Sequence, residues 1–173
     1  ALAALQEGVI DTSTQFRCGY TYYNADMPDF HPLCMGTHGY LNVIEALTVS
    51  CNIFFYDTGY NLGIDNMNLY QRKLGLGELT GVEIYESDGT LAGPDEKEDW
   101  YGGDTIMAAI GQSDNLITPV QLATYAATIA NNGTRLRTHV VDKITDYSRQ
   151  TVLEETKPEV VEENIFDQEV LET

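Results

Sequence analysis

The chain has 173 residues, 43% of them hydrophobic, which is long enough for a domain with its own apolar core. Nine basic residues against 27 acidic ones give a net charge of −18. This charge argues against nucleic acid as a partner, because phosphate binding needs clustered lysine and arginine. No apolar run reaches the ~18 residues of a transmembrane helix, and no charged-then-apolar leader opens the sequence.

The acidic residues are concentrated in two stretches. Residues 83–104 carry eight acids against Lys97, and residues 151–173 carry eight against Lys157. We interpret both as solvated surface. Calcium binding is the alternative, but residues 95–99 lack the alternating ligands and the glycine of an EF-hand loop.

The three cysteines are Cys18, Cys34 and Cys51, and an odd number does not make a disulfide scaffold. Cys18 and Cys34 bracket one loop, with His31 and His38 nearby. A zinc site from these four residues is conceivable, but the spacing matches no CxxC or HxxxH pair, so we expect no metal and no cofactor. In an oxidising compartment, a disulfide between Cys18 and Cys34 is the favoured interpretation.

Residues 1–7 have high helix propensity and stop at Gly8, a typical C-cap. No N-cap precedes them, so we expect the last two turns of a helix that begins outside this sequence. Residues 9–40 are rich in tyrosine and proline, and there we expect loops with short strands.

The clearest helices follow. Asn42 and Glu45 have capping-box spacing and predict a helix start. Residues 50–52 interrupt it, and a second apolar helix over residues 53–62 ends at Gly63. A third helix is expected over residues 65–74, with Asp65 as its cap.

Residues 76–104 read as acidic loop, with turn signals at residues 88–89, 93–94 and 102–103. Thr118, Pro119 and Gln121 then predict a well-capped helix that ends at residues 131–133. Small residues give this helix a face for close packing: Ala123, Ala126, Ala127 and Ala130.

Beyond this helix the pattern changes to strands. We expect strands over residues 136–144 and 151–155 around a turn at residues 146–149, and we assign no structure to the tail from Lys157. The expected organisation is a helix end at 1–8, a loop-rich segment at 9–40, a helical region at 41–133, a strand hairpin at 134–156 and an acidic tail at 157–173.

Three blocks in order carry a family resemblance. Residues 46–55, ALTVSCNIFF, resemble the Ser-x-Asn region of penicillin-binding transpeptidases. Residues 111–123, GQSDNLITPVQLA, followed by residues 130–134, ANNGT, resemble a later block of that family. Residues 1–11 resemble the segment that follows its Ser-x-x-Lys motif.

The resemblance implies roles for two residues. Acyl transfer to a serine needs a nucleophile, a base and groups that pass protons to the leaving amine. By analogy, Ser50 takes the proton-relay role and Asn52 orients the substrate amide and the lysine, while the Cys51 side chain should point away from the cleft. Without the flanking blocks, Ser50 and Asn52 would read as helix caps. A second triplet, residues 113–115, is the literal Ser-Asp-Asn, and we expect it to be a decoy.

Two family motifs are missing from the sequence. None of the four lysines has a serine three residues before it, and none is followed by Thr-Gly or Ser-Gly. The chain therefore lacks both Ser-x-x-Lys and Lys-Thr-Gly. We expect a piece from the middle of a larger domain, inactive by itself.

The resemblance implies an α+β fold: the mainly helical part of a penicillin-binding-protein transpeptidase domain plus a β-hairpin. The whole protein would be a peptidoglycan D,D-transpeptidase that acts on stem peptides, is acylated by β-lactams and works outside the cytoplasmic membrane, with an anchor outside these residues. A β-lactam sensor or a non-catalytic scaffold with the same fold is the alternative, and a serine β-lactamase ranks below both. Since the family's central sheet is largely missing, the piece by itself is expected to be marginally stable or to self-associate.

Overall fold

The computed structural model describes all 173 residues. The chain divides into two compact units, each described by itself below. The first unit contains residues 1–70, 90–116 and 166–173, and the second contains residues 71–89 and 117–165. The mixture of helix and strand confirms the predicted α+β class. No helix has both the length and the apolar character needed to cross a membrane.

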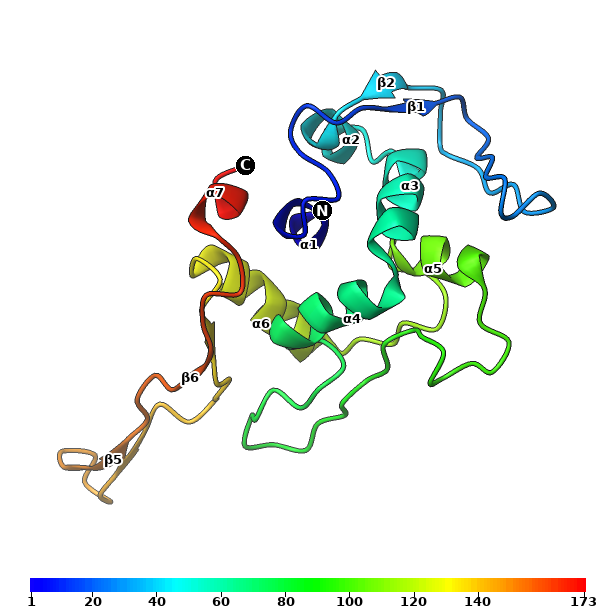
Figure 1. Cartoon of the computed structure of the whole chain (residues 1–173). Helices are drawn as coiled ribbons and strands as arrows, with labels where there is room; N and C mark the ends of the chain where they lie inside the picture. Colours follow the sequence, from blue (N-terminus) through cyan, green and yellow to red (C-terminus); the bar gives the residue numbers. More distant parts are fainter. The chain divides into compact units, whose positions relative to one another are not determined.

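The first unit is built around one central helix (Figure 1). Its elements are α1 (Leu2–Gln6), β1 (Phe16–Cys18), β2 (Gly39–Leu41), α2 (Val43–Thr48), α3 (Asn52–Leu62), α5 (Gly102–Ala108) and α7 (Gln168–Leu171). Helix α3 contacts α1, α2, α5 and β1. It buries Ile53, Phe54, Tyr56 and Leu62 in the unit's single core. Strands β1 and β2 pair antiparallel, with Phe16 opposite Leu41.

A glycine allows the closest helix contact in this core. A Cβ atom on Gly59 of α3 would lie 2.2 Å from the Cβ of Ala109, just beyond α5. Real Cβ atoms do not approach so closely, so only glycine permits this distance between the two helices.

The predicted ends of the first helices are largely confirmed. The side chain of Asn42 accepts from the backbone N–H of Glu45 at 3.0 Å, and Glu45 accepts in return from Asn42, which completes the capping box. Helix α3 ends at Gly63, whose φ of +79° is in the left-handed region. The cap predicted at Asp65 is wrong: α4 (Ile64–Lys73) begins one residue earlier, and Asp65 lies in its first turn, where its charge favours the helix dipole.

The turn predicted at residues 102–103 is also wrong, because both glycines open helix α5. The Asp104 carboxylate accepts from the backbone N–H of Tyr101 at 3.2 Å and fixes the start of this helix. A Cβ atom on Gly103 would lie 2.3 Å from the Tyr101 ring. Here glycine makes room for a packed aromatic ring rather than for a turn.

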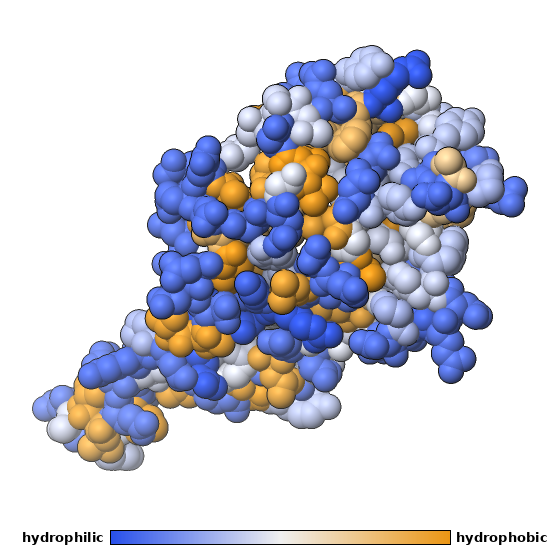
Figure 2. Space-filling model, in the orientation of Figure 1, coloured by the Kyte–Doolittle hydropathy of each residue, from blue (hydrophilic) through white to orange (hydrophobic).

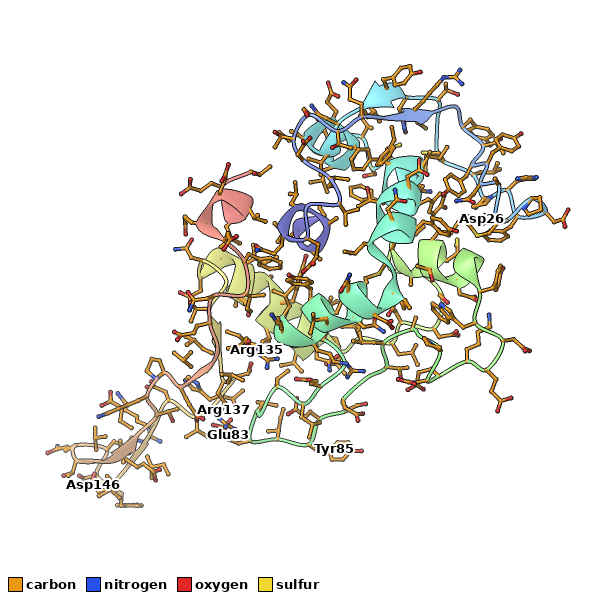
Figure 3. All side chains as sticks on the ribbon, viewed as in Figure 1. Asp26, Glu83, Tyr85, Arg135, Arg137 and Asp146 are labelled. Carbon is orange, nitrogen blue, oxygen red and sulfur yellow. The ribbon has the colours of Figure 1, made fainter.

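The second unit contains one long helix and two strand pairs. Its elements are α6 (Pro119–Ala130), β3 (Arg135–Leu136), β4 (Lys143–Thr145), β5 (Val152–Glu155) and β6 (Val160–Glu162). The hairpin of β4 and β5 confirms the predicted turn, and Asp146 lies in that turn (Figures 1 and 3). A continuous strand over residues 136–144 is wrong, because β3 pairs with β6 from the unassigned tail. The hairpin exposes several apolar side chains (Figure 2), among them Ile144, Val152 and Leu153.

Helix α6 starts as predicted, but its packing face differs. Thr118 accepts from the backbone N–H of Gln121, and Pro119 is the first helical residue. The buried residues of the helix are Gln121, Thr124 and Thr128. The predicted face of four alanines is not buried, so that prediction is wrong. The threonine hydroxyls bond to backbone carbonyls one turn earlier in the helix, which lets polar side chains face inward.

Candidate active site and thiol–imidazole cluster

Ser50 occupies a sharp turn between α2 and α3. Helix α2 ends at Thr48 and α3 begins at Asn52. Ser50 has φ +52°, a left-handed conformation that is uncommon for any residue with a Cβ atom. Its side chain is exposed, and its hydroxyl has no hydrogen-bond partner within the protein. Many helices end with one residue in this conformation, most often a glycine.

The Asn52 side chain faces a loop far away in the sequence. Its Nδ2 atom donates to the backbone carbonyl of Leu33 at 3.2 Å. Asn52 is half-buried, at the first position of α3. Ser50 and Asn52 are therefore close together at one end of α3.

The side chains of these two residues cap no helix, but the backbone of Ser50 closes α2: the Ser50 N–H donates to the Leu47 carbonyl at 3.3 Å and the Cys51 N–H donates to the Ala46 carbonyl at 2.9 Å. The N-cap of α3 is Cys51, and no side chain caps that end. The C-cap of α2 is Val49. Glycine is the usual residue at such a turn, so the turn explains the backbone of Ser50 but not the serine and asparagine side chains.

The second triplet behaves differently, although Ser113 also has a positive φ, +66°. Both ends of the Asn115 amide are used inside the fold. Its Oδ1 atom accepts from the Ala92 backbone N–H at 3.0 Å, and its Nδ2 atom donates to the Gln112 carbonyl at 3.1 Å. These bonds hold a turn beside the bridge of Thr90 and Leu116, so Asn115 already has a structural role.

Cys51, the residue after Ser50, belongs to a cluster of four metal-ligating side chains. Cys18, Cys34, Cys51 and His38 place their ligating atoms within 4.8 Å of one another. We call these four residues the thiol–imidazole cluster. His38 Nδ1 lies 3.6 Å from each of the Cys18 and Cys34 sulfurs, and the Cys34 and Cys51 sulfurs are 4.0 Å apart. The three cysteines are buried, as expected for the Cys51 side chain.

The cluster has the donor set and the dimensions of a tetrahedral zinc site. Bond lengths of about 2.3 Å to sulfur and about 2.0 Å to nitrogen imply S···S separations of about 3.8 Å and S···N separations of about 3.6 Å. The 3.6 Å and 4.0 Å distances observed here are close to these values. Three thiolates and one imidazole also form one of the usual structural zinc sets.

The surroundings of Cys34 favour its ionised form. Burial raises the pKa of the Cys34 thiol, but the backbone N–H groups of Gly36, Ile53 and Asn52 outweigh burial, and its pKa lies below the usual value. For Cys51, burial dominates and raises the pKa to about 12. A metal ion would be needed to ionise Cys51 at neutral pH.

The cysteine predictions need correction. All three cysteines are free thiols in the structure, so the Cys18–Cys34 disulfide is not formed. His31 takes no part in the cluster; it is exposed and packs on the Tyr23 ring at 4.8 Å. The fourth member of the cluster is Cys51 instead of His31. All three cysteines lie within the first 51 residues, which indicated that they could form one site. Their spacing matches no known pair motif, so the sequence alone did not predict the site.

The chain matches a known protein family over its whole length. The model of the penicillin binding protein transpeptidase domain matches residues 1–173. The chain therefore belongs to this family, as the resemblance predicted.

The relatives agree with this assignment. The peptidoglycan D,D-transpeptidase MrdA of Acinetobacter baumannii is 34% identical over 148 residues, which are 82% of this chain and 22% of the relative. Penicillin-binding protein 2A of Bacillus subtilis is 27% identical and is matched over 92% of this chain and 24% of its own length.

Solved structures share the fold. Pseudomonas aeruginosa PBP2, in complex with WCK 5153, has a TM-score of 0.81 at 24% identity, over 99% of this chain and 39% of its own. A chain of a peptidoglycan synthase complex has a TM-score of 0.81 at 30% identity, over 99% of this chain and 30% of its own. The present chain thus spans about a quarter of its curated relatives.

Proposed function

We propose that this chain is the part of a peptidoglycan D,D-transpeptidase that carries the Ser-x-Asn motif, with Ser50 as proton relay and Asn52 as the orienting amide. The observation that carries the proposal is the exposed, left-handed Ser50 beside Asn52 at a helix junction that neither side chain caps. The relatives named D,D-transpeptidases, and the similarity to a peptidoglycan synthase complex, support the same class.

The chemistry of the two side chains fits these roles. A serine hydroxyl both donates and accepts, so Ser50 can take a proton from one group and pass it to the amine that leaves when the acyl-enzyme forms. An asparagine amide offers two donors and an acceptor, so Asn52 can hold a substrate carbonyl while it keeps the Leu33 contact. The nucleophilic serine and its lysine would come from outside these residues, since the chain has no Ser-x-x-Lys.

Substrate and location follow from this class. The proposed substrates are peptidoglycan stem peptides. β-Lactams would acylate the same nucleophilic serine, which lies outside these residues. The reaction would take place on the outer side of the cytoplasmic membrane, where peptidoglycan lies.

The test uses a complete transpeptidase domain that contains this segment. Ser50→Ala or Asn52→Ala should slow acylation by a labelled penicillin by on the order of 10²-fold or more, the usual scale for losing a proton-transfer or orienting group. Ser113→Ala is the matched control, because it removes the corresponding hydroxyl from the second triplet, and it should leave the rate unchanged. Loss of acylation in a folded Ser113→Ala protein, with Ser50→Ala unaffected, would reverse the assignment.

We also propose that the thiol–imidazole cluster binds a structural zinc ion. The supporting observation is the convergence of four ligating atoms within 4.8 Å. Bound zinc would hold the loop of Cys34 and His38 against α3, and it would supply no chemistry to the substrate. Elemental analysis of purified protein should find one zinc per chain, and Cys18→Ser should abolish it. Metal-free protein from zinc-replete cells would contradict this proposal.

A further inference from the structure

Two links between the same pair of chain segments lie next to each other. The first is the hydrogen bond from Asn52 Nδ2 to the Leu33 carbonyl. The second is the 4.0 Å contact between the sulfurs of Cys34 and Cys51, the residues that directly follow Leu33 and directly precede Asn52. Because Cys34 adjoins Leu33 and Cys51 adjoins Asn52, a bond that fixes the two sulfurs would also restrict both partners of the Asn52–Leu33 hydrogen bond.

The Leu33 side chain does little to hold its own carbonyl in place. It is 49% exposed, whereas Cys34 is only 4% exposed. The backbone next to Leu33 is held by the bridge between Leu33 and Thr21 and by the bond from the Cys34 N–H to the Tyr20 carbonyl at 2.8 Å, and the buried Cys34 side chain anchors it from the other side. The Cys34 sulfur lies 4.0 Å from the Cys51 sulfur, so it already packs against the residue that precedes α3.

Ser50 lies on the other side of Cys51 from Asn52. Its left-handed conformation belongs to the turn that closes α2, in which the Ser50 N–H donates to the Leu47 carbonyl at 3.3 Å. The residue after it, Cys51, is fully buried, and its backbone N–H donates to the Ala46 carbonyl at 2.9 Å. Cys51 is therefore anchored through both its backbone and its buried side chain, and it joins the two polar members of the motif.

Without a metal, this support is weak. A thiol is a poor hydrogen-bond donor and acceptor, and the thiol–imidazole cluster has only long contacts of 3.6 to 4.0 Å between its members. Metal–thiolate bonds would replace these contacts by directional links of about 2.3 Å. The bound metal would then add a strong link between the Leu33 loop and the first turn of α3, which are otherwise joined by the Asn52 hydrogen bond and the long contact of the two sulfurs.

We propose that zinc in the thiol–imidazole cluster positions Asn52 for acylation by fixing Cys34 and Cys51, so that metal loading controls the Ser-x-Asn motif. The part that concerns acylation rests on the function proposed above. The part that concerns position rests on the proposed zinc site and on the Leu33–Asn52 and Cys34–Cys51 contacts, and does not depend on the catalytic role proposed for Asn52. Cys34 and Cys51 are positioning residues in this scheme, and the metal does not touch the substrate.

The first measurement does not depend on activity. Hydrogen exchange is followed in the complete protein, with and without zinc, for the peptides that contain residues 31–35 and 51–55. Zinc should slow exchange in both by at least tenfold, and Cys18→Ser should remove that effect. Exchange that is unchanged by zinc in a protein shown to bind it would overturn the proposal.

Cys18→Ser is the sharpest variant for the acylation test. Cys18 is remote in sequence from both Leu33 and Asn52, and serine can still donate to the Gly36 carbonyl, as the Cys18 thiol does at 3.3 Å. The zinc-free variant should be acylated more slowly by on the order of 10²-fold, close to the loss for Asn52→Ala. Val43→Ala, a core truncation outside the cluster, controls for a general loss of stability and should keep its acylation rate.

A double mutant separates positioning from general structural damage. If the metal acts through Asn52, Cys18→Ser should add no further loss of rate to Asn52→Ala. Losses that multiply would overturn the proposal, as would a folded, zinc-free Cys18→Ser protein with the normal rate. Should Asn52→Ala leave acylation unchanged, the function assigned to Asn52 fails, and the exchange measurement still decides the positional claim.

Discussion

The Gln121 side chain donates to the backbone carbonyl of Asp88 at 2.7 Å, and thereby ties helix α6 to a loop 33 residues earlier in the sequence. The same Nε2 atom donates to the Glu78 carbonyl at 2.7 Å. Its Oε1 atom accepts from the Thr118 backbone N–H at 3.0 Å, and the residue is fully buried. One amide therefore satisfies three backbone groups.

Gln121→Ala should lower the free energy of unfolding by about 3 kcal/mol, because it leaves buried carbonyls unpaired and removes half of a capping box. Chemical denaturation measures this loss. Gln121→Glu is the matched variant: it keeps the cap acceptor but replaces the two donors by a carboxylate facing two carbonyls, and it should be at least as destabilising at neutral pH. A Gln121→Ala loss below about 0.5 kcal/mol would contradict this account.

Asp57 provides a pH test in the first unit. Burial raises the pKa of its carboxyl, and the hydrogen bond from the Tyr22 hydroxyl at 3.0 Å offsets this only in part. Between the unfolded value of about 3.9 and the raised folded value, the native state binds more protons than the unfolded state. The free energy of unfolding should therefore fall as pH rises through that window.

Asp57→Asn should remove this dependence, because an amide can still accept from Tyr22 but does not ionise. The stability of the variant relative to wild type should increase as pH rises through the window, in melting experiments from pH 3 to pH 8. Asp29→Asn, at an exposed position, makes the same change in charge and is the control. Equal curves for the two variants would show that burial of Asp57 has no effect on stability.

Local signals predicted the helix boundaries well, because a cap is decided by a few neighbouring residues. The boxes at Asn42 and Thr118 and the stop at Gly63 needed nothing beyond the local sequence. The start of α5 was missed because Gly102 and Gly103 serve a ring contact that no turn pattern describes.

Contacts far apart in sequence were harder to predict. Ser50 and Asn52 were found through flanking blocks, since two polar residues at a helix junction carry no signal of their own. The thiol–imidazole cluster was missed because His38 and Cys51 come together with Cys18 only after the first strand pair and α3 have packed. The same holds for β6, whose partner β3 lies some two dozen residues earlier in the chain.

Gly59→Ala tests the close contact of α3 with the end of α5. The new methyl group would meet the Ala109 Cβ at 2.2 Å, so one helix must move. We expect a loss of about 2 kcal/mol in thermal or chemical unfolding, despite the higher helix propensity of alanine. Ala109→Gly in the Gly59→Ala background should recover part of it, since it removes the opposing methyl group. A stabilised Gly59→Ala protein would mean that the helices are further apart than described.

The final prediction concerns the chain taken alone: the 173 residues should form no covalent adduct with a labelled penicillin. A stable acyl-enzyme needs an activated serine, and activation requires a base within hydrogen-bond reach. No serine here has a lysine three residues later. Ser50 has no hydrogen-bonded base. Lys97 lies in the first unit, but it forms an ion pair with Asp104 at 2.7 Å.

Intact-mass spectrometry after incubation and denaturation measures the outcome directly. A complete transpeptidase domain that contains this segment serves as the positive control, and its loss of label on Ser50→Ala would show that the motif is competent when a nucleophile is present. A stoichiometric mass gain on the isolated chain would contradict the prediction. Digestion and sequencing of the labelled peptide would then identify the serine that reacted, and would show whether it is Ser50 or Ser113.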